Sequence, residues 1–433
     1  MNQFLCRPGG ELGGRVRVPG DKSISHRSII FSSIAEGTSR ISGFLSGEDS
    51  MNTLRAFQAM GVNIDCSADA ICVHGVGLHG LQPAEEPLQM GNSGTAMRLM
   101  LGLLAGQSFD SSLIGDESLS VRPMNRVIKP LTAMGAVVTS ADGGCAPLQI
   151  SGGQKIRATE YDMPVASAQV KSCILLAGIY AGGITRVREP APTRDHSERM
   201  LRGFGCEVVT QGAQISFQGG QSLRATNIEI PADISSAAFF MVAASIAPNS
   251  EIVLEHVGIN PTRTGVIDIL RLMGADITLS DERDVGGEPV ADITVRSAVL
   301  NGIDIPQALV PLAIDEFPVL FIAAACARGT TRLSGAEELR VKESDRIQVM
   351  ADGLQSLGIE VTTRPDGLDI VGGKLSGGRV DSHGDHRCAM AFSVAALCCK
   401  SDLIVDNCSN VDTSFPGYVE ISSKAGLKVD INE

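Results

Sequence analysis

Six copies of one short pattern divide this 433-residue chain into units of about 70 residues. In each copy a helical pattern ends at a glycine and a short apolar strand pattern follows, as in LTAMGAVV and LRLMGADI. Glycine directly after a helix readily adopts the left-handed conformation that ends the helix. We therefore expect a left-handed residue at Gly61, Gly135, Gly205, Gly274, Gly358 and Gly426.

A second pattern with the same spacing alternates with the first. Helices rich in small and apolar residues end in a turn that leads into a strand, as in VLFIAAACARGTTRLSG. Chance does not repeat two markers six times at one period, so we predict an α/β protein made of six units with two helices and several strands each. The largest gap holds a polar insertion, SDERDVGGE (280–288). The turns fall at Gly37, Gly106, Gly182, Asn249, Gly329 and Lys400.

Length and composition narrow the class of protein. A chain of 433 residues is expected to form two domains. The net charge of −13 argues against a nucleic-acid partner, although a local basic pocket can still bind a small anion. The 11 cysteines show no CxxC spacing, which is typical of buried, reduced thiols. Because we find no signal-peptide pattern and the apolar stretch 237–247 is too short to span a bilayer, we expect a soluble cytoplasmic protein.

Polar and charged residues gather where the apolar helices are predicted to begin. Backbone N–H groups at a helix N-terminus favour anions such as phosphate and carboxylate. Helix capping alone would explain Ser235 and Asp233, but it does not explain Lys22, Arg27 and Arg387, since basic residues there oppose the helix dipole. The helix starts are GDKS (20–23), GNSGT (91–95), SAQ (167–169), DISS (233–236), DE (315–316) and GDHR (384–387).

More basic residues lie near the starts of the second series of helices. Each one alone is better explained as a solvated surface charge, but their recurrence predicts a cleft that binds more than one anionic group. These residues are Arg122, Arg194, Arg263, Lys342 and Arg346, with Glu343 beside the last two.

Three other motifs do not indicate a site of their own. GVGLHG (75–80) matches a dinucleotide-binding motif, but prolines follow where its helix would begin. PGDKS has Asp21 where a phosphate-binding P-loop has a glycine before the lysine. DSHGDH (381–386) could ligate a metal, but without a further ligand group we interpret it as turn and orienting residues before Arg387.

From PGDKSISHR (19–27) onward, the chain resembles the family of 5-enolpyruvylshikimate-3-phosphate synthases. The resemblance covers essentially the whole chain. It implies an α/β fold of two lobes, each with three βαβαββ repeats around a pseudo-threefold axis (an inside-out α/β barrel), which agrees with the six repeats. The further motifs follow in the family's order: GNSGTAMR (91–98), RPM (122–124), ASAQVKS (166–172), TRDH (193–196), DEFP (315–318), LRVKESDR (339–346) and GDHRCAM (384–390).

The resemblance also implies how the chain is divided. Residues 1–20 and 235–433 would form lobe 1, with the first strand and repeats four to six. Residues 21–234 would form lobe 2, with repeats one to three. The active site would lie in the cleft between the lobes.

The implied activity is transfer of the enolpyruvyl (1-carboxyvinyl) group of phosphoenolpyruvate to the 5-hydroxyl of shikimate 3-phosphate, with release of phosphate. This step belongs to the shikimate pathway to chorismate and the aromatic amino acids. Asp315 would accept the hydroxyl proton, Glu343 would handle the proton at C3 of the enol ether, and Lys22 would also be catalytic. The shikimate 3-phosphate site would comprise Lys22, Ser23, Arg27, Ser167, Ala168, Gln169, Arg194, Asp315 and Lys342. The phosphoenolpyruvate site would comprise Lys22, Asn92, Gly94, Arg122, Gln169, Arg346 and Arg387.

These residue types suit the reaction. A carboxyl group can protonate C3 of the enol phosphate, which makes C2 electrophilic, and a second carboxylate can remove the hydroxyl proton. Arginines bind carboxylate and phosphate through paired hydrogen bonds and align the reactants. The resemblance implies no metal and no cofactor. The two substrates would be the partners of a monomer that binds neither nucleic acid nor membrane.

Three positions matter within the family pattern. Some members have a second serine where this chain has Ala168, so another group, such as Arg194, must supply that phosphate contact. Some carry a lysine just before a TFP-like segment near the C-terminus, where this chain reads DTSFP (412–416), and Thr413 is not assigned the role of that lysine. Some members that glyphosate inhibits poorly have alanine at the position of Gly94, and this chain is therefore expected to be a glyphosate target.

Two other functions fit part of the pattern. A related transferase that passes enolpyruvyl to a UDP-linked amino sugar shares the fold but lacks the DKSxSHR segment. A non-enzymatic scaffold of stacked repeats would not need Lys22, Asp315, Glu343 and Arg387 at helix starts. An assay of phosphate release with either acceptor separates these hypotheses.

Overall fold

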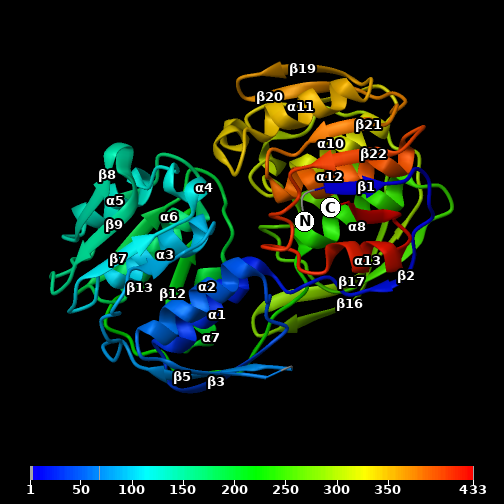
Figure 1. Cartoon of the computed structure of the whole chain (residues 1–433). Helices are drawn as coiled ribbons and strands as arrows, with labels where there is room; N and C mark the ends of the chain where they lie inside the picture. Colours follow the sequence, from blue (N-terminus) through cyan, green and yellow to red (C-terminus); the bar gives the residue numbers. More distant parts are fainter. Residues whose placement is uncertain (1–2, 68, 433) are drawn as a thin grey trace. The chain divides into compact units, whose positions relative to one another are not determined.

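The computed structural model describes residues 3–67 and 69–432 (Figure 1). The chain forms two compact units. Unit 1 contains the described residues of Met1–Pro19, Pro231–Asp284 and Pro289–Glu433, and unit 2 contains those of Gly20–Ile230 and Val285–Glu288. The division predicted from the sequence changes unit after residues 20 and 234, whereas the contacts within the chain change unit after Pro19 and Ile230 and also assign Val285–Glu288 to unit 2.

Two of the six sheets show the complete repeat, and the other four are variants of it, because, among the described residues, one has only three strands and three take a strand from elsewhere in the chain. An edge strand leads into an apolar helix, and the next strand pairs with that edge strand in parallel. A second helix and an antiparallel hairpin complete the repeat. An example is the sheet with the order β6 (Leu88–Gln89), β7 (Ser111–Ile114), β9 (Cys145–Ser151) and β8 (Val137–Ala141), in which Leu88 pairs with Leu113 in parallel. The predicted βαβαββ repeat is confirmed.

Unit 2 contains repeats one to three. Repeat one consists of α1 (Lys22–Ser33), β3 (Glu36–Ser42), α2 (Glu48–Ala59), β4 (Asn63–Cys66) and β5 (Ile71–Val76). Repeat two consists of β6 (Leu88–Gln89), α3 (Gly94–Leu104), β7 (Ser111–Ile114), α4 (Glu117–Ser120), α5 (Asn125–Ala133), β8 (Val137–Ala141), the turn η1 (Asp142–Gly144) and β9 (Cys145–Ser151). Repeat three consists of β10 (Glu160–Asp162), α6 (Ala168–Gly178), β11 (Ile184–Arg188), α7 (His196–Gly203), β12 (Val208–Gln211) and β13 (Gln214–Gln218).

Unit 1 contains repeats four to six. Repeat four consists of α8 (Ile234–Ile246), β15 (Glu251–Gly258), α9 (Gly265–Leu272), β16 (Asp276–Val285) and β17 (Glu288–Arg296). Repeat five consists of η2 (Gln307–Leu309), α10 (Phe317–Cys326), β18 (Thr330–Leu333), η3 (Glu337–Val341), α11 (Arg346–Ser356), β19 (Glu360–Arg364) and β20 (Gly367–Val371). Repeat six consists of β21 (Gly378–Asp381), α12 (His386–Ala395), η4 (Ala396–Cys398), β22 (Leu403–Asp406), α13 (Tyr418–Ala425) and β23 (Val429–Asn432).

Three short strands complete sheets far from their place in the sequence. The strand before α1, β2 (Gly13–Val16), pairs in parallel with β15 of repeat four. The strand before α8, β14 (Ile228–Glu229), pairs in parallel with β3 of repeat one. The first strand, β1 (Gln3–Cys6), pairs with both β22 and β23 and lies beside β22 in Figure 1. Repeats one and four therefore exchange their edge strands, and the N-terminal strand completes repeat six.

The glycine pattern is confirmed at the helix ends. All six glycines of the first marker have φ between +86° and +111°. At the second marker each apolar helix is followed by a strand, as predicted; Gly37, Asn249 and Gly329 there also have positive φ, as does Gly183 next to Gly182.

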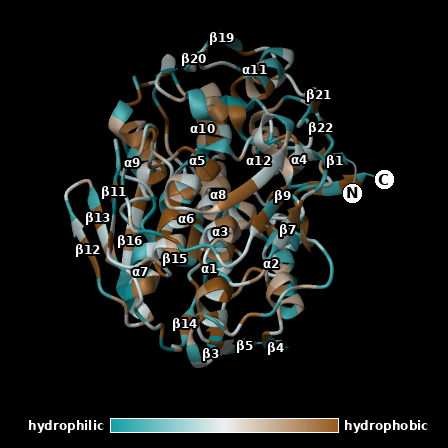
Figure 2. Cartoon of the chain, turned by 90° about the vertical axis from the view of Figure 1, so that its left-hand side faces the viewer, coloured by the Kyte–Doolittle hydropathy of each residue, from teal (hydrophilic) through white to brown (hydrophobic). Residues whose placement is uncertain are grey.

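The apolar helices form a separate core in each unit. In unit 1, α8, α10 and α12 pack against one another, and in unit 2, α3 packs on α6 and α1. A Cβ at Gly102 of α3 would lie 2.2 Å from the carbonyl oxygen of Cys173 on α6, so this close approach requires glycine. Figure 2 shows the apolar residues, in brown, concentrated on helices rather than on the outer loops.

All 11 cysteines are free thiols. Six of them are buried, but Cys66 is exposed, so the expectation of buried thiols is wrong at that residue. In the described parts of the chain, no helix is both long enough and apolar enough to cross a membrane.

Candidate active site

Many of the predicted site residues lie at the N-termini of the apolar helices, and the others lie at or shortly before the starts of α5, α7 and α11. In unit 2, the side chains of Asp21, Ser93 and Ser167 cap α1, α3 and α6 by accepting hydrogen bonds from backbone N–H groups in the first turn. In unit 1, Asp233 caps α8 and Asp385 caps α12. The cap of α8 is thus Asp233 alone, and Ser235 has a different role.

Lys22 is the first residue of α1 and forms an ion pair with Asp49 in the first turn of α2. The Lys22 side chain is 21% exposed, whereas that of Asp49 is 3% exposed. The Asp49 carboxylate offsets the unfavourable position of a lysine at a helix start. Sequence reasoning missed Asp49, because an acidic residue in a first helical turn is commonplace.

Arg27 is buried and binds three helices together. Its Nε donates to Ser197 Oγ on α7 at 2.7 Å, its Nη2 donates to Ser172 Oγ on α6 at 2.8 Å, and its Nη1 donates to the carbonyl of Ser23 on α1 at 2.9 Å. Burial lowers the pKa of Arg27 to about 10, so the guanidinium remains charged at neutral pH. The neighbouring His26 is neutral there, since burial, Lys22 and Arg27 hold its pKa well below the usual value.

Gln169 connects the first turns of α6 and α3. Its amide oxygen accepts a hydrogen bond from Arg98, and its Nε2 donates to Thr95 Oγ1 at 2.8 Å. Ser167, Ala168 and Gln169 are all half-buried at the start of α6. Arg98 was missed as a site residue, although an arginine inside the apolar helix of GNSGTAMR was a usable signal.

Asn92 and Arg122 are joined beside the start of α3. Arg122 Nη2 donates to Asn92 Oδ1 and to Ser118 Oγ, both at 3.1 Å. Asn92 Nδ2 in turn donates to Asp116 Oδ2 at 2.9 Å. A Cβ at Gly94 would lie 3.1 Å from Arg98 Nη1 and 3.6 Å from Arg122 Nη1, so two guanidinium groups lie over this glycine.

The loop that carries Arg194 rests on a buried charge cluster. Lys171 Nζ is 3.0 Å from Glu189 Oε1 and 2.6 Å from Glu198 Oε1, and its side chain is 1% exposed. Thr193, next to Arg194, donates to Glu189, and its carbonyl lies 3.5 Å from Lys171 Nζ. Burial raises the pKa of Glu189, while Lys171 and Thr193 act in the opposite direction. This cluster ties the Arg194 loop to α6.

Arg346 donates hydrogen bonds to three carboxylates in unit 1. Its Nη2 donates to Glu343 Oε2 at 2.6 Å, its Nη1 to Asp315 Oδ1 at 3.4 Å, and its Nε to Asp385 Oδ2 at 2.8 Å. Burial opposes the charge of this 1% exposed side chain, but Asp385, Glu343 and Asp315 together raise the pKa of Arg346. Burial also opposes ionisation of Asp385, yet Arg346 holds the pKa of that carboxyl below its usual value.

Lys342 and Arg387 complete this group around Asp315. Lys342 Nζ lies 3.3 Å from Asp315 Oδ1, and Arg387 Nη1 donates to the Asp315 carbonyl at 3.1 Å. The Arg387 side chain is 13% exposed and the Asp315 side chain 15% exposed. The group therefore combines two partly accessible carboxylates, Asp315 and Glu343, with three cations.

The structure brings the unit 1 residues into one contact network and the unit 2 residues into several smaller ones. Within unit 2, the smaller networks are centred on Lys22, Arg27, Gln169 and Arg122. The segment 381–386 acts as a turn, because Asp381 Oδ1 accepts from His383 N at 2.7 Å and Asp385 is committed to Arg346. Thr413 Oγ1 donates to the carbonyl of Asn410 at 2.6 Å within its own turn.

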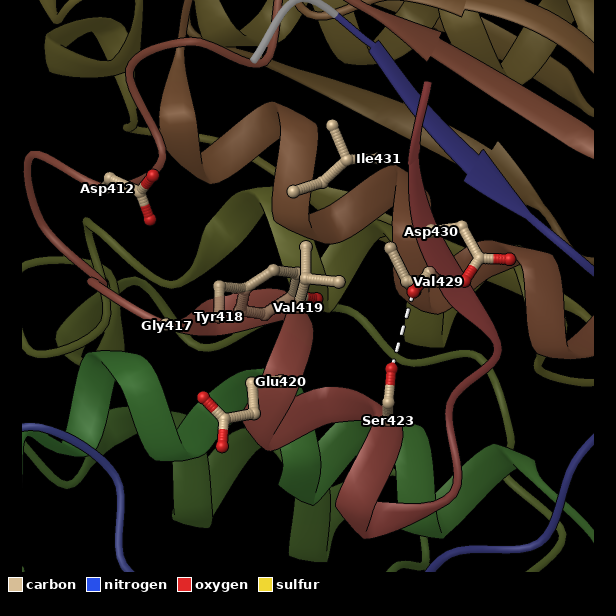
Figure 3. Close-up of a pocket in the computed structure, with 9 residues that line it drawn as sticks. All are labelled: Asp412, Gly417, Tyr418, Val419, Glu420, Ser423, Val429, Asp430 and Ile431. Atoms are coloured by element: carbon tan, nitrogen blue, oxygen red, sulfur yellow. Dashed lines mark hydrogen bonds between the residues drawn. The ribbon is translucent and has the colours of Figure 1, made fainter. Parts of the chain in front are cut away.

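A separate hollow of about 430 Å³ lies beside α13 and β23 in unit 1 (Figure 3). Its lining contains none of the predicted site residues. The lining residues are Asp412, Gly417, Tyr418, Val419, Glu420, Ser423, Val429, Asp430 and Ile431.

Comparison with known proteins identifies relatives along the whole chain. A model of the family "EPSP synthase (3-phosphoshikimate 1-carboxyvinyltransferase)" matches residues 6–421. The 3-phosphoshikimate 1-carboxyvinyltransferase of Alkalilimnicola ehrlichii is 64% identical over 98% of this chain and 96% of its own length. That of Nitrosococcus oceani is 62% identical over the same shares. The solved structure of EPSP synthase from Acinetobacter baumannii is 54% identical, covers 100% of both chains and superposes with a TM-score of 0.90.

Proposed function

This chain belongs to the EPSP synthase family, the 3-phosphoshikimate 1-carboxyvinyltransferases of the shikimate pathway, and on that premise we propose which of its side chains carry the enolpyruvyl transfer. The reaction joins the 5-hydroxyl oxygen of shikimate 3-phosphate to C2 of phosphoenolpyruvate and releases inorganic phosphate.

Asp315 is proposed as the base that removes the proton of the 5-hydroxyl. Lys342 and Arg346 lie 3.3 Å and 3.4 Å from Asp315 Oδ1 and favour the ionised carboxylate. An ionised, partly accessible carboxylate is what a proton acceptor requires.

Glu343 is proposed to donate a proton to C3 of the enolpyruvyl group and later to take one back. Lys22 is proposed as a further catalytic residue. Protonation of C3 makes C2 electrophilic, and the 5-hydroxyl oxygen then bonds to C2 while its proton passes to Asp315. When the C2–O bond to phosphate breaks, the C3 methyl group returns a proton and the new enol ether forms. The carboxylate of Glu343 is held 2.6 Å from Arg346 Nη2, which keeps it oriented through both steps.

The anionic groups of the substrates are proposed to bind at the helix starts. Shikimate 3-phosphate would be bound by Lys22, Ser23, Arg27, Ser167, Ala168, Gln169, Arg194, Asp315 and Lys342. Lys22, Asn92, Gly94, Arg122, Gln169, Arg346 and Arg387 would bind phosphoenolpyruvate. Helix N-termini and arginines together stabilise phosphate and carboxylate without a metal ligand set. We further propose that the enzyme is a cytoplasmic monomer, which size-exclusion chromatography with light scattering and cell fractionation would check.

The observation that carries this assignment is that Asp315 and Glu343 share one buried guanidinium, that of Arg346. Its test is phosphate release from phosphoenolpyruvate in the presence of either shikimate 3-phosphate or a UDP-linked amino sugar. We expect release with shikimate 3-phosphate only.

Asp315→Asn keeps the side-chain shape but removes the base. We expect turnover to fall about 10²-fold or more, with the KM of both substrates largely retained. Asp304→Asn, at an exposed aspartate of the same unit that pairs with Arg332, is the matched control and should retain full activity. Normal turnover by Asp315→Asn would show that another group is the base.

A further inference from the structure

The carboxylates of Asp315 and of the next residue, Glu316, contact two different pairs of cations. Asp315 is partly exposed and contacts Lys342 and Arg346. The Glu316 side chain is fully buried at the start of α10, and its Oε1 lies 3.8 Å from Arg263 Nη2 and 3.9 Å from Arg387 Nη1. The family pattern gave no role to Glu316 or to Arg263.

The Glu316 carboxylate is anchored at one oxygen. Ser235, in the first turn of α8, donates a hydrogen bond to Oε1, and Oε2 makes no hydrogen bond. At 3.9 Å the contact with Arg387 is too long for a hydrogen bond, so it acts through charge. Replacement by glutamine would keep the shape and the contact with Ser235 and remove only the charge.

Arg263 and Asp233 hold this anchor in place. Arg263 Nη2 donates to Asp233 Oδ1 at 3.0 Å and to Ser235 Oγ at 2.7 Å. The two carboxylates, Glu316 and Asp233, thus balance the charges of Arg263 and Arg387 inside the unit. The starts of α8, α10 and α12 meet through this network.

Arg387 is fixed from one side by residues 315 and 316. The Asp315 carbonyl accepts a hydrogen bond from Arg387 Nη1 at 3.1 Å, and Glu316 Oε1 lies 3.9 Å from the same nitrogen. The guanidinium has further N–H groups, and its side chain keeps 13% of its surface accessible. A guanidinium held in this way is oriented before an anion arrives, which lowers the entropy lost on binding.

We propose that Glu316 is a positioning residue that orients Arg387 to bind phosphoenolpyruvate. The proposal rests on the function assigned to Arg387 above. Because the Glu316 side chain is fully buried, it would not contact substrate itself, and its effect on phosphoenolpyruvate would pass through Arg387. It follows that loss of its charge changes the binding of phosphoenolpyruvate and leaves that of shikimate 3-phosphate unchanged.

The test is a double-mutant cycle of Glu316→Gln and Arg387→Lys, with steady-state kinetics titrated separately in each substrate. We expect Glu316→Gln to raise the KM for phosphoenolpyruvate about 10-fold, and Glu316→Asp, which keeps the charge, to raise it less. In the Arg387→Lys background, Glu316→Gln should add less than about 3-fold, because the guanidinium it orients is gone. Glu337→Gln, at an exposed glutamate of the same unit, is the matched control.

The possible results distinguish the positioning role of Glu316 from the phosphoenolpyruvate-binding role of Arg387. Should Arg387→Lys leave the KM for phosphoenolpyruvate unchanged, the binding role of Arg387 fails, and the role of Glu316 fails with it. Should Arg387→Lys raise that KM while Glu316→Gln does not, or should Glu316→Gln raise both KM values equally, only the positioning role is overturned. If Glu316→Gln does not fold, Glu316→Asp and Ser235→Ala decide the question, since each displaces the carboxylate and must affect phosphoenolpyruvate selectively.

Discussion

Gly94 begins α3 with the guanidinium groups of Arg98 and Arg122 over the place where a side chain would project. A methyl group there would meet the far ends of two flexible side chains at 3.1 Å and 3.6 Å, and not backbone, so the fold tolerates Gly94→Ala. The methyl group would nevertheless occupy space beside the proposed phosphoenolpyruvate site. The position is therefore suited to altering ligand selectivity without loss of structure.

We predict that glyphosate inhibits this enzyme in competition with phosphoenolpyruvate, and that Gly94→Ala weakens the inhibition. Extended glyphosate is longer than phosphoenolpyruvate, so the added methyl group should hinder the inhibitor more than the substrate. An overlap that costs about 1–3 kcal/mol raises the inhibition constant about 5- to 150-fold. Inhibition measured at several phosphoenolpyruvate concentrations compares that rise with the change in KM.

The control for this substitution is Gly182→Ala, since nothing lies within 4 Å of a Cβ at Gly182 and its φ is outside the left-handed region, so the inhibition constant should not change there. Equal increases in the inhibition constant and in the KM of Gly94→Ala, or a wild-type enzyme insensitive to glyphosate, would contradict the prediction.

At the scale of elements, Asp385 joins α11 to α12. It caps α12 by accepting from Arg387 N at 2.9 Å, and it pairs with the buried Arg346 at the start of α11. One carboxylate therefore sets the positions of two helix starts that carry proposed binding residues.

The lowered pKa of Asp385 predicts how this contribution depends on pH. A carboxyl whose folded-state pKa is depressed adds stability above its unfolded value, near 3.8, and loses it as pH falls toward the folded-state value. At neutral pH we expect Asp385→Asn to lower the free energy of unfolding by about 3–5 kcal/mol, because Arg346 loses a buried partner. The difference from wild type should shrink below pH 3.8.

Urea unfolding followed by circular dichroism at a series of pH values measures this difference. Asp402→Asn, at an exposed aspartate, provides the baseline. A difference that stays constant from neutral pH to strongly acidic pH would mean that the charge of Asp385 is not what stabilises the two helices.

At the scale of the whole molecule, the N-terminal strand closes a sheet made by the C-terminal end of the chain. Phe4 in β1 pairs with Val405 of β22 and Ile431 of β23, and its side chain is fully buried with its ring centroid 6.0 Å from that of Tyr418. The last repeat therefore cannot complete its sheet until residues at both ends of the sequence have met.

Phe4→Ala is expected to lower the free energy of unfolding by about 3–5 kcal/mol, because removal of the buried ring leaves a cavity in the core. Leu5→Ala, on the opposite face of the same strand, should cost about 1 kcal/mol or less. Denaturant titration of the two variants measures both values. A similar loss in both variants would argue against an integral role of β1 in the core.

The repeats, the helix ends and most of the proposed site residues could be predicted from the sequence because each depends on neighbours in the chain. A glycine after a helix, a capping side chain and a basic residue at a helix start are local features, and all six predicted glycines have the left-handed conformation. The family motifs add the candidate residues in order along the chain. Resemblance thus identified Asp315, Glu343 and Arg346 as a set, although they are not adjacent in the sequence.

Contacts between distant segments were decided by the tertiary structure. Three examples depend on the packing of separate helices and strands. β2 and β14 pair in sheets of distant repeats, Asp49 pairs with Lys22, and Glu316 Oε1 lies 3.9 Å from Arg387 Nη1. Nothing in the local pattern around Asp49 or Glu316 distinguishes it from an ordinary acidic residue at a helix start. Such a carboxylate acquires its role only when burial removes water from it and folding brings a particular cation within about 4 Å, because the strength of that interaction depends on both.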